Sequence, residues 1–355
     1  MDRTTRLLSG ATHATRIIEI GPSHAPIAPK QGGWNARVVD HASQAELRAK
    51  YAGFHVDLDA IEAVDYVWAG GTLEAAIPQA DHGRFDLLIA SHVIEHLPDL
   101  AGFLLSAQTV MAADGALSLA VPDKRYCFDY YKPWSTTGDV LAGHSAGRHG
   151  KRTAWNHLAY SISMDGAIAW GQHPTQAPKF LHDFADAQAA MQIWQDTPDA
   201  PYVDYHAWQF TPASFALIVL ELAQLGIIDW HIDTLHDTAG CEFIVLLKRG
   251  RESFATPQDL QAARMALLDR TLLEARAQID EARFLDPVPE TAGHPPADSA
   301  ALRQVIDLLH AQSLRLAELE AVAAWNRKAL LPLRAVWRAG QPLRRAWVRL
   351  FGGPG

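Results

Sequence analysis

Short apolar runs recur along the first 250 residues and end at glycine, proline or acidic residues. Such runs are typical of buried strands, and amphipathic stretches between them are typical of helices. We expect strands at 17–20, 37–39, 61–68, 87–90 and 116–121. Helices are expected at 42–51, 72–77 and 99–112. Strand and helix in alternation predict a parallel α/β sheet wrapped by helices.

The alternation of strands and helices is predicted to end, near residue 250, with a helix and two antiparallel strands. Thr211 and Pro212 suit the N-cap and first position of a helix, which runs to about Leu225 and stops at Gly226. Two further apolar runs, at 227–235 and 242–247, flank a turn and predict an antiparallel hairpin. The expected fold is therefore a Rossmann-like, doubly wound, mostly parallel sheet with a terminal antiparallel hairpin, within residues 1–250.

Two residues at the ends of the first two strands suggest a ligand. Gly21 follows the first strand and Asp40 ends the second. Ligands of parallel α/β sheets collect at the carboxyl ends of strands, and an acid about 20 residues after the first glycine turn suits a ribose diol. The pattern predicts a nucleoside-containing cofactor with Asp40 on its ribose. A structural turn beside a solvated acid is the alternative interpretation.

Four segments together resemble the class I S-adenosylmethionine-dependent methyltransferases, in the type 11 and type 23 branch. They are EIGPS at 19–23, VVDH at 38–41, FDLLIASHVIEHLPDL at 85–100 and ADGALSLAVPDK at 113–124. The resemblance spans about residues 16–249 and implies S-adenosyl-L-methionine as the cofactor. It implies contacts to the methionine end from Glu19, Gly21, Pro22 and Ser23, to the ribose from Asp40, near the adenine from Gly71 and Thr72, and beside cofactor and substrate from Ser91 and His92.

The first loop departs from the family pattern. Prolines at 22, 26 and 29 replace the further glycines, and they fix φ and remove amide donors, so the loop cannot be a regular helix. A methionine carboxylate needs fewer donors than a pyrophosphate, so this loss weighs more against dinucleotide binding. A nicotinamide-dependent dehydrogenase is disfavoured because the GxGxxG fingerprint is missing.

Residues 124–208 break the alternation and are rich in aromatic residues and histidines. As an insertion after the fifth strand they would lie over the carboxyl edge of the sheet, so we interpret them as a substrate lid for a small polar or saccharide acceptor. A small satellite core is the alternative. A hydroxyl acceptor needs a base, and histidine is the natural type. The candidate catalytic residues are His92, His96, His157 and His206.

A metal site is not expected, because the chain contains neither CxxC nor HExxH. His182, Asp183, Asp204 and His206 could contribute ligands only if the fold brings them together. The two cysteines, Cys127 and Cys241, are far apart and fit a reducing compartment. A net charge of -9 disfavours general nucleic-acid binding. Without a signal peptide or membrane span in the pattern, we expect a cytoplasmic protein.

The last hundred residues have a different organisation. We expect a charged helix at 251–285, a proline-rich linker at 286–298, an amphipathic helix at 299–330 and a basic tail at 331–355 rich in Trp and Arg. The helices suit oligomer formation, and the tail suits a peripheral membrane or protein contact. These features suggest recruitment to surface polysaccharide biosynthesis. A non-catalytic methyltransferase-fold scaffold that binds partners is the alternative function.

Overall fold

The computed structural model describes residues 2–172, 174, 177–196 and 203–282. Residues 1–285 form one compact unit. The linker, the amphipathic helix and the basic tail expected at 286–298, 299–330 and 331–355 lie outside the described residues. No helix within the described ranges is long and apolar enough to cross a bilayer.

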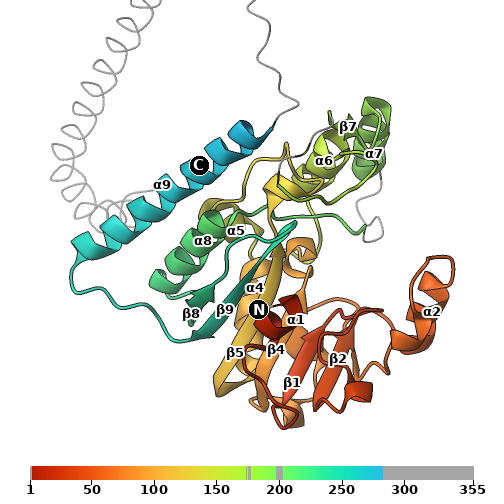
Figure 1. The fold of residues 1–355 in the computed structure, drawn as a ribbon, viewed down its shortest axis with the longest axis vertical. Helices are drawn as coiled ribbons and strands as arrows, with labels where there is room; N and C mark the ends of the chain where they lie inside the picture. Colours follow the sequence, from red (N-terminus) through yellow and green to blue (C-terminus); the bar gives the residue numbers. More distant parts are fainter. Residues whose placement is uncertain (1, 173, 175–176, 197–202, 283–355) are drawn as a thin grey trace, which may run out of the picture. The chain divides into compact units, whose positions relative to one another are not determined.

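A seven-stranded sheet with the order β3-β2-β1-β4-β5-β9-β8 organises the compact unit. The strands are β1 (Ile17–Ile20), β2 (Ala36–Asp40), β3 (Tyr66–Val67), β4 (Phe85–Ser91), β5 (Met111–Pro122), β8 (Trp230–Leu235) and β9 (Glu242–Arg249). The first five run parallel, whereas β9 is antiparallel to β5 and to β8. The predicted doubly wound, mostly parallel sheet with a terminal antiparallel hairpin is confirmed (Figure 1).

The third strand is much shorter than predicted, because only Tyr66 and Val67 pair with β2. Before it, Asp65 N still donates to Val38 O of β2 at 2.9 Å, and side-chain acceptors add further contacts to this segment. Glu62 accepts the backbone N–H groups of Lys30 and Gln31, and Asp65 accepts that of Val38 at 2.7 Å. These carboxylates satisfy the neighbouring backbone without extending the sheet. The prediction of a strand over 61–68 was therefore wrong for residues 61–65 and for residue 68.

Successive side chains of the central strands are buried on opposite faces of the sheet, because side chains alternate in direction along a strand. Ile18 and Leu88 join the larger core, which α3 (Leu73–Ala76), α4 (Leu100–Val110) and α8 (Pro212–Gln224) complete. Ile17 and Ile89 join a smaller core on the other face. There α1 (Arg3–Leu8) and residues 27–28 of the proline-rich loop cover the sheet. The short helix α2 (Gln44–Tyr51) follows β2.

Two helices with capped N-termini, α8 and α9, pack against each other in the last part of the compact unit. Thr211 caps α8 in a capping box with Ser214, and Pro212 occupies its first turn, as predicted. The helix expected at 251–285 is α9 (Pro257–Glu281), capped by Thr256. It packs on α8, with Arg264 paired to Glu221 at 2.6 Å (Figure 1). This helix therefore belongs to the same compact unit as the sheet.

The lid segment, residues 124–208, follows β5 and holds three helices and a small hairpin among its described residues. They are α5 (Thr137–Gly143), α6 (Lys151–Tyr160), α7 (Phe184–Asp196), β6 (Ile162–Ser163) and β7 (Lys179–Phe180). The end of the segment lies against the turn after β4, where Ala207 N donates to Glu95 O at 2.7 Å and Trp208 Nε1 to Leu97 O at 2.6 Å. The end of the segment therefore lies at the carboxyl edge of the sheet, and its role as a substrate lid stays a prediction.

Candidate functional site

The turn after β1 requires glycine. Gly21 has φ +64°, and a Cβ at this position would meet Val93 Cγ2 at 3.2 Å. Its N–H donates to Val39 O at 2.7 Å, which directs the chain toward the end of β2. Ser23 also has a positive φ of 50°, and its buried hydroxyl oxygen has no hydrogen-bond partner among the described residues. The turn after Pro22 thus presents an unsatisfied polar atom at the carboxyl edge.

Buried carboxylates hold the proline-rich loop in place. Both oxygens of Glu19 accept loop N–H groups, from Ile27 at 2.6 Å and from Ala28 at 3.0 Å. Glu62 accepts the N–H groups of Lys30 and Gln31, which begin a short 3₁₀ turn at Lys30–Gly32. Burial raises the pKa of Glu19 to about 7, although the two N–H donors favour its ionised form. The predicted irregular loop is confirmed, and the contact of Glu19 with a cofactor stays a prediction.

Asp40 lies at the end of β2 and faces this turn. It is 4% exposed. One carboxylate oxygen accepts the Ser23 N–H at 3.2 Å, and the other accepts the backbone N–H of His41 at 2.8 Å. The structure thus places Gly21, Ser23 and Asp40 together between the carboxyl ends of β1, β2 and β4. The strand order reverses between β1 and β4, beside this cluster, and open α/β sheets bind ligands at such a reversal.

Gly71 and Thr72 follow β3 and start the next helix. Gly71 has φ +74°, and its carbonyl accepts the Trp68 indole N–H at 3.1 Å. Thr72 is the N-cap residue of α3. Trp68 stacks on Phe103 with ring centroids 6.3 Å apart. Sequence reasoning did not single out Trp68, although an aromatic residue directly after a strand was the available signal.

Ser91 and His92 contact charged side chains of the first helix, α1, and of the last strand, β9. Arg3 of α1 donates to Ser91 Oγ at 2.6 Å and pairs with Glu242 of β9 at 2.6 Å. His92 Nε2 lies 2.7 Å from Glu242 Oε2, and the residue has a positive φ of 54°. Although burial raises the pKa of Glu242, contacts with His92 and Arg3 lower it to about 2. Sequence reasoning missed Arg3 and Glu242, which lie 88 and 150 positions from Ser91 and His92 respectively.

The next turn, η4 (Ile94–His96), meets the end of the lid segment. His96 and His206 form an edge-to-face ring pair with centroids 4.5 Å apart. Burial lowers the pKa of His96, but the negative charges of Asp204 and Glu95 outweigh burial and raise the pKa above its usual value. Asp204 Oδ1 lies 2.8 Å from His96 Nδ1. The structure therefore brings two of the four candidate catalytic histidines into contact.

A buried ion pair supports His206. Its Nδ1 lies 2.6 Å from Asp129 Oδ2, and the other oxygen of Asp129 accepts from Lys132 at 2.5 Å. Burial opposes ionisation of Asp129, but the His206 and Lys132 charges hold its pKa well below the usual range. Asp129 and Lys132 therefore fix the orientation of the His206 ring from inside the lid.

His157 lies on α6, farther inside the lid. Its ring packs against Tyr205 at 4.7 Å and Phe128 at 5.7 Å between centroids. Burial lowers its pKa to about 3, so this imidazole is uncharged at neutral pH. Packing accounts for its surroundings, and its catalytic role stays a prediction.

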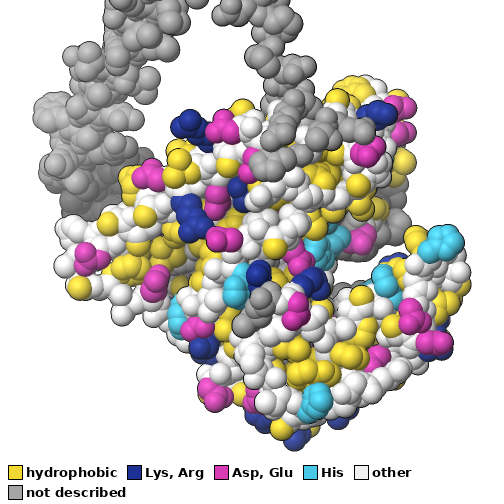
Figure 2. Space-filling model, viewed as in Figure 1, with side chains coloured by type: hydrophobic (Ala, Val, Ile, Leu, Met, Phe, Trp, Pro, Cys, Tyr) yellow, Lys and Arg dark blue, Asp and Glu magenta, His cyan; other side chains and the backbone are white. Residues whose placement is uncertain are grey.

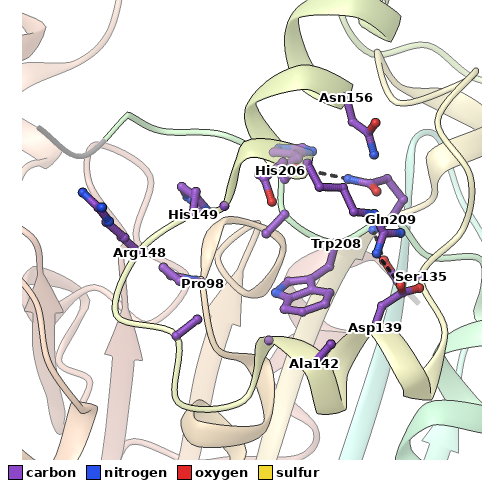
Figure 3. Close-up of a pocket in the computed structure, with 16 residues that line it drawn as sticks. Pro98, Ser135, Asp139, Ala142, Arg148, His149, Asn156, His206, Trp208 and Gln209 are labelled. Atoms are coloured by element: carbon purple, nitrogen blue, oxygen red, sulfur yellow. Dashed lines mark hydrogen bonds and ion pairs between the residues drawn. The ribbon is translucent and has the colours of Figure 1, made fainter. Parts of the chain in front are cut away.

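A pocket of about 260 Å³ opens beside His206. His149, Asn156, Gln209 and Trp208 are among its lining residues, contributed by the lid segment and the residue that follows it (Figure 3). The Gln209 amide donates to His206 O at 3.1 Å. Figure 2 also shows the surface hollowed between the part that carries α2 and the part that carries the lid helices. The pocket combines hydrogen-bonding groups with an aromatic wall.

The chain was compared with known proteins. No family model and no curated protein matches it. Solved structures match over about 70% of the chain. An S-adenosylmethionine-dependent methyltransferase from Mesorhizobium loti matches at 12% identity and TM-score 0.34, over 68% of this chain and 95% of its own. One from Methanosarcina mazei matches at 10% identity and TM-score 0.35, over 71% and 100%.

A third match carries a different name. A Rhodobacter sphaeroides protein named as a Zn-dependent alcohol dehydrogenase matches at 13% identity and TM-score 0.38, over 70% of this chain and 89% of its own. At these TM-scores the likenesses carry no weight for activity. The methyltransferase fold of this chain rests on its strand order and terminal hairpin.

Proposed function

We propose that the chain is an S-adenosylmethionine-dependent methyltransferase acting on a small polar or saccharide acceptor. The observation that carries the proposal is the meeting of Gly21, Ser23 and Asp40 where the strand order of the methyltransferase fold reverses. Asp40 offers carboxylate oxygens to two ribose hydroxyls, and Ser23 offers an unsatisfied hydroxyl. The anchored loop between them keeps its shape through four carboxylate-to-backbone hydrogen bonds.

Each part of the cofactor has residues of this chain to bind it. Gly21 allows close backbone approach at the methionine end, and Glu19 supports that end through the loop it holds. Trp68, Gly71 and Thr72 would border the adenine. Ser91 and His92 would lie on the side facing the acceptor. When bound, S-adenosylmethionine supplies a methyl group on a sulfonium sulfur.

The lid pocket suits the acceptor. Asn156, Gln209 and His149 provide hydrogen-bonding groups, and Trp208 provides a ring face. Together they favour a hydroxyl-bearing ring such as a sugar. A hydroxyl acceptor has to lose its proton as its oxygen takes the methyl group. His206 lines the pocket and contacts His96, so these histidines link the pocket to the end of β4.

The test is calorimetric titration of the full chain with S-adenosylmethionine, S-adenosylhomocysteine and NAD, each separately. We expect binding of the first two and none of NAD. Asp40→Ala removes charge-assisted hydrogen bonds worth about 1.5–3 kcal/mol each, so affinity should fall at least about 10-fold. Asp40→Asn should give a similar loss with less disturbance of Ser23.

The control is Asp114→Ala, which removes an exposed acidic residue near the start of β5, at the other end of the strand from the site. This variant should bind the cofactor like the unmodified chain. A folded protein that binds neither methionine-derived ligand would refute the enzyme and favour a partner-binding scaffold. Equal losses in the Asp40 and Asp114 variants would refute the assignment of Asp40 to the ribose.

A further inference from the structure

We propose that Glu95, His96 and His206 bind a divalent transition-metal ion of the zinc class. Each residue offers a ligand atom, and the three atoms lie within 4.8 Å of one another. Two of the residues come from the turn after β4, and the third comes from the end of the lid segment, 110 positions after His96. The site therefore joins the sheet to the lid.

The state of Glu95 points to a cation. The residue is 1% exposed, and neither of its carboxylate oxygens has a hydrogen-bond partner among the described residues. Its Oε1 lies 3.7 Å from His96 Nε2 and 3.7 Å from His92 Nδ1, beyond hydrogen-bond distance. A buried carboxylate without hydrogen bonds is costly, and coordination of a cation removes that cost.

Carboxylates contact the Nδ1 atoms of His206 and His96, which leaves the Nε2 atom of each ring for an ion. Asp129 occupies Nδ1 of His206 at 2.6 Å, and Asp204 lies 2.8 Å from Nδ1 of His96. Metal-binding histidines almost always give their second ring nitrogen to a carboxylate or carbonyl, which fixes the ring and its tautomer. The Nε2 atoms are therefore the ligand atoms, and both rings carry the supporting shell that such a site needs.

The backbone holds the two ligand-bearing segments together before any ion binds. Glu95 O accepts the N–H of Ala207, the residue after His206, at 2.7 Å. Ligand atoms around a tetrahedral ion with bonds near 2.0–2.1 Å lie about 3.3 Å apart. The Glu95–His96 separation of 3.7 Å needs only a small contraction to reach that geometry.

Two imidazoles and one carboxylate are a donor set for zinc and neighbouring transition metals, and three protein ligands leave a position open. His206 also lines the pocket of the lid segment. This next step rests on the proposed function: an acceptor hydroxyl in that position would become more acidic and would release its proton to solvent water before its oxygen takes the methyl group. The two histidines would then act through the ion and would not themselves take the proton.

The experiment measures metal binding by the full chain without any cofactor. Protein stripped with a chelator is titrated with Co²⁺, and the visible d–d bands report the coordination number; Zn²⁺ is titrated by calorimetry. We expect saturation at one ion per chain, bands of a four- or five-coordinate ion, and displacement of Co²⁺ by Zn²⁺. Mg²⁺ should not displace it, because nitrogen ligands disfavour that ion.

Three variants locate the ion. Glu95→Gln and His206→Ala should each abolish the cobalt bands, and Asp129→Asn should weaken affinity about 10–100-fold. His55→Ala, which removes an exposed histidine after α2, is the matched control and should bind like the unmodified chain. Circular dichroism confirms that each variant is folded, and any that unfolds is replaced by His96→Gln.

Two results would overturn the proposal: no stoichiometric cobalt binding by the unmodified chain, or unchanged bands in Glu95→Gln and His206→Ala. Titration of the chelator-treated protein with S-adenosylmethionine keeps the two proposals apart. Cofactor binding without metal binding sinks only the metal site, and metal binding without cofactor binding sinks only the methyltransferase.

Discussion

Glu19 links the stability of the fold to pH. Its carboxylate is 2% exposed and accepts the N–H groups of Ile27 and Ala28. Burial raises its pKa from 4.5 to about 7, with the nearby Glu62 charge adding to the effect, while the two N–H donors and Arg3 oppose it. An acid with a raised pKa in the folded state keeps its proton there after the unfolded chain has released it.

The sign and size of the pH effect of Glu19 on the free energy of unfolding follow from proton linkage. Below pH 4.5 both states are protonated, so the contribution of Glu19 is fully present. As pH rises from 4.5 to about 7, the unfolded state gains stability relative to the fold, and above 7 the loss is complete. A shift of this size corresponds to about 3 kcal/mol in total, of which roughly 2–3 kcal/mol falls between pH 5 and pH 8.

The assay is urea unfolding of the unmodified chain and of Glu19→Gln at several pH values from 5 to 8. The variant does not titrate at position 19, so subtracting its free energy of unfolding removes the contribution of the chain's many histidines. We expect the unmodified chain to lose roughly 2–3 kcal/mol relative to the variant across this range. A difference that stays constant with pH would show that the pKa of Glu19 is not shifted in the fold, and a change in the opposite direction would show that it is lowered; either result refutes the reasoning.

Two further predictions concern the turn after β1 and the start of α8. Gly21→Ala should cost about 1–2 kcal/mol for the left-handed backbone, plus crowding against Val93, and should weaken cofactor binding. Gly53→Ala, with open space around it, is the control for urea unfolding and calorimetry, and an equal effect of both changes would contradict the reasoning. Thr211→Ala removes the capping bond to Ser214 and should cost about 1 kcal/mol, measured by urea unfolding; no loss would mean that the cap is replaced.

The sequence predicted the fold well where one apolar period extends over a whole element. The run at 87–90 became β4, and Thr211 with Pro212 marked the start of α8. Prediction failed at 61–65, because the carboxylates of Glu62 and Asp65 bind the backbone of other segments there. Such bonds join residues about 30 positions apart, and hydrophobic periodicity carries no information about them.

The proline-rich loop shows a similar limit. Prolines at 22, 26 and 29 were enough to exclude a helix, because their effect on the backbone is local. They could not show that Glu19 would turn both oxygens toward the loop. The family resemblance placed this residue beside the cofactor, which stays a prediction, whereas the contacts seen in the fold are with the loop.

The histidine cluster separates what local spacing can reveal from what the fold must supply. The HVIEH segment marked His92 and His96 as residues near the cofactor mouth, but the absence of CxxC and HExxH led to the expectation that no metal binds. Those motifs detect only ligands that share one element. Glu95 and His96 are adjacent, whereas His206 reaches them because Ala207 is hydrogen-bonded to Glu95 across the sheet edge. A glutamate inside a buried apolar segment, next to a histidine, was the available local signal, and the loss of the cobalt bands in Glu95→Gln is the direct test of its meaning.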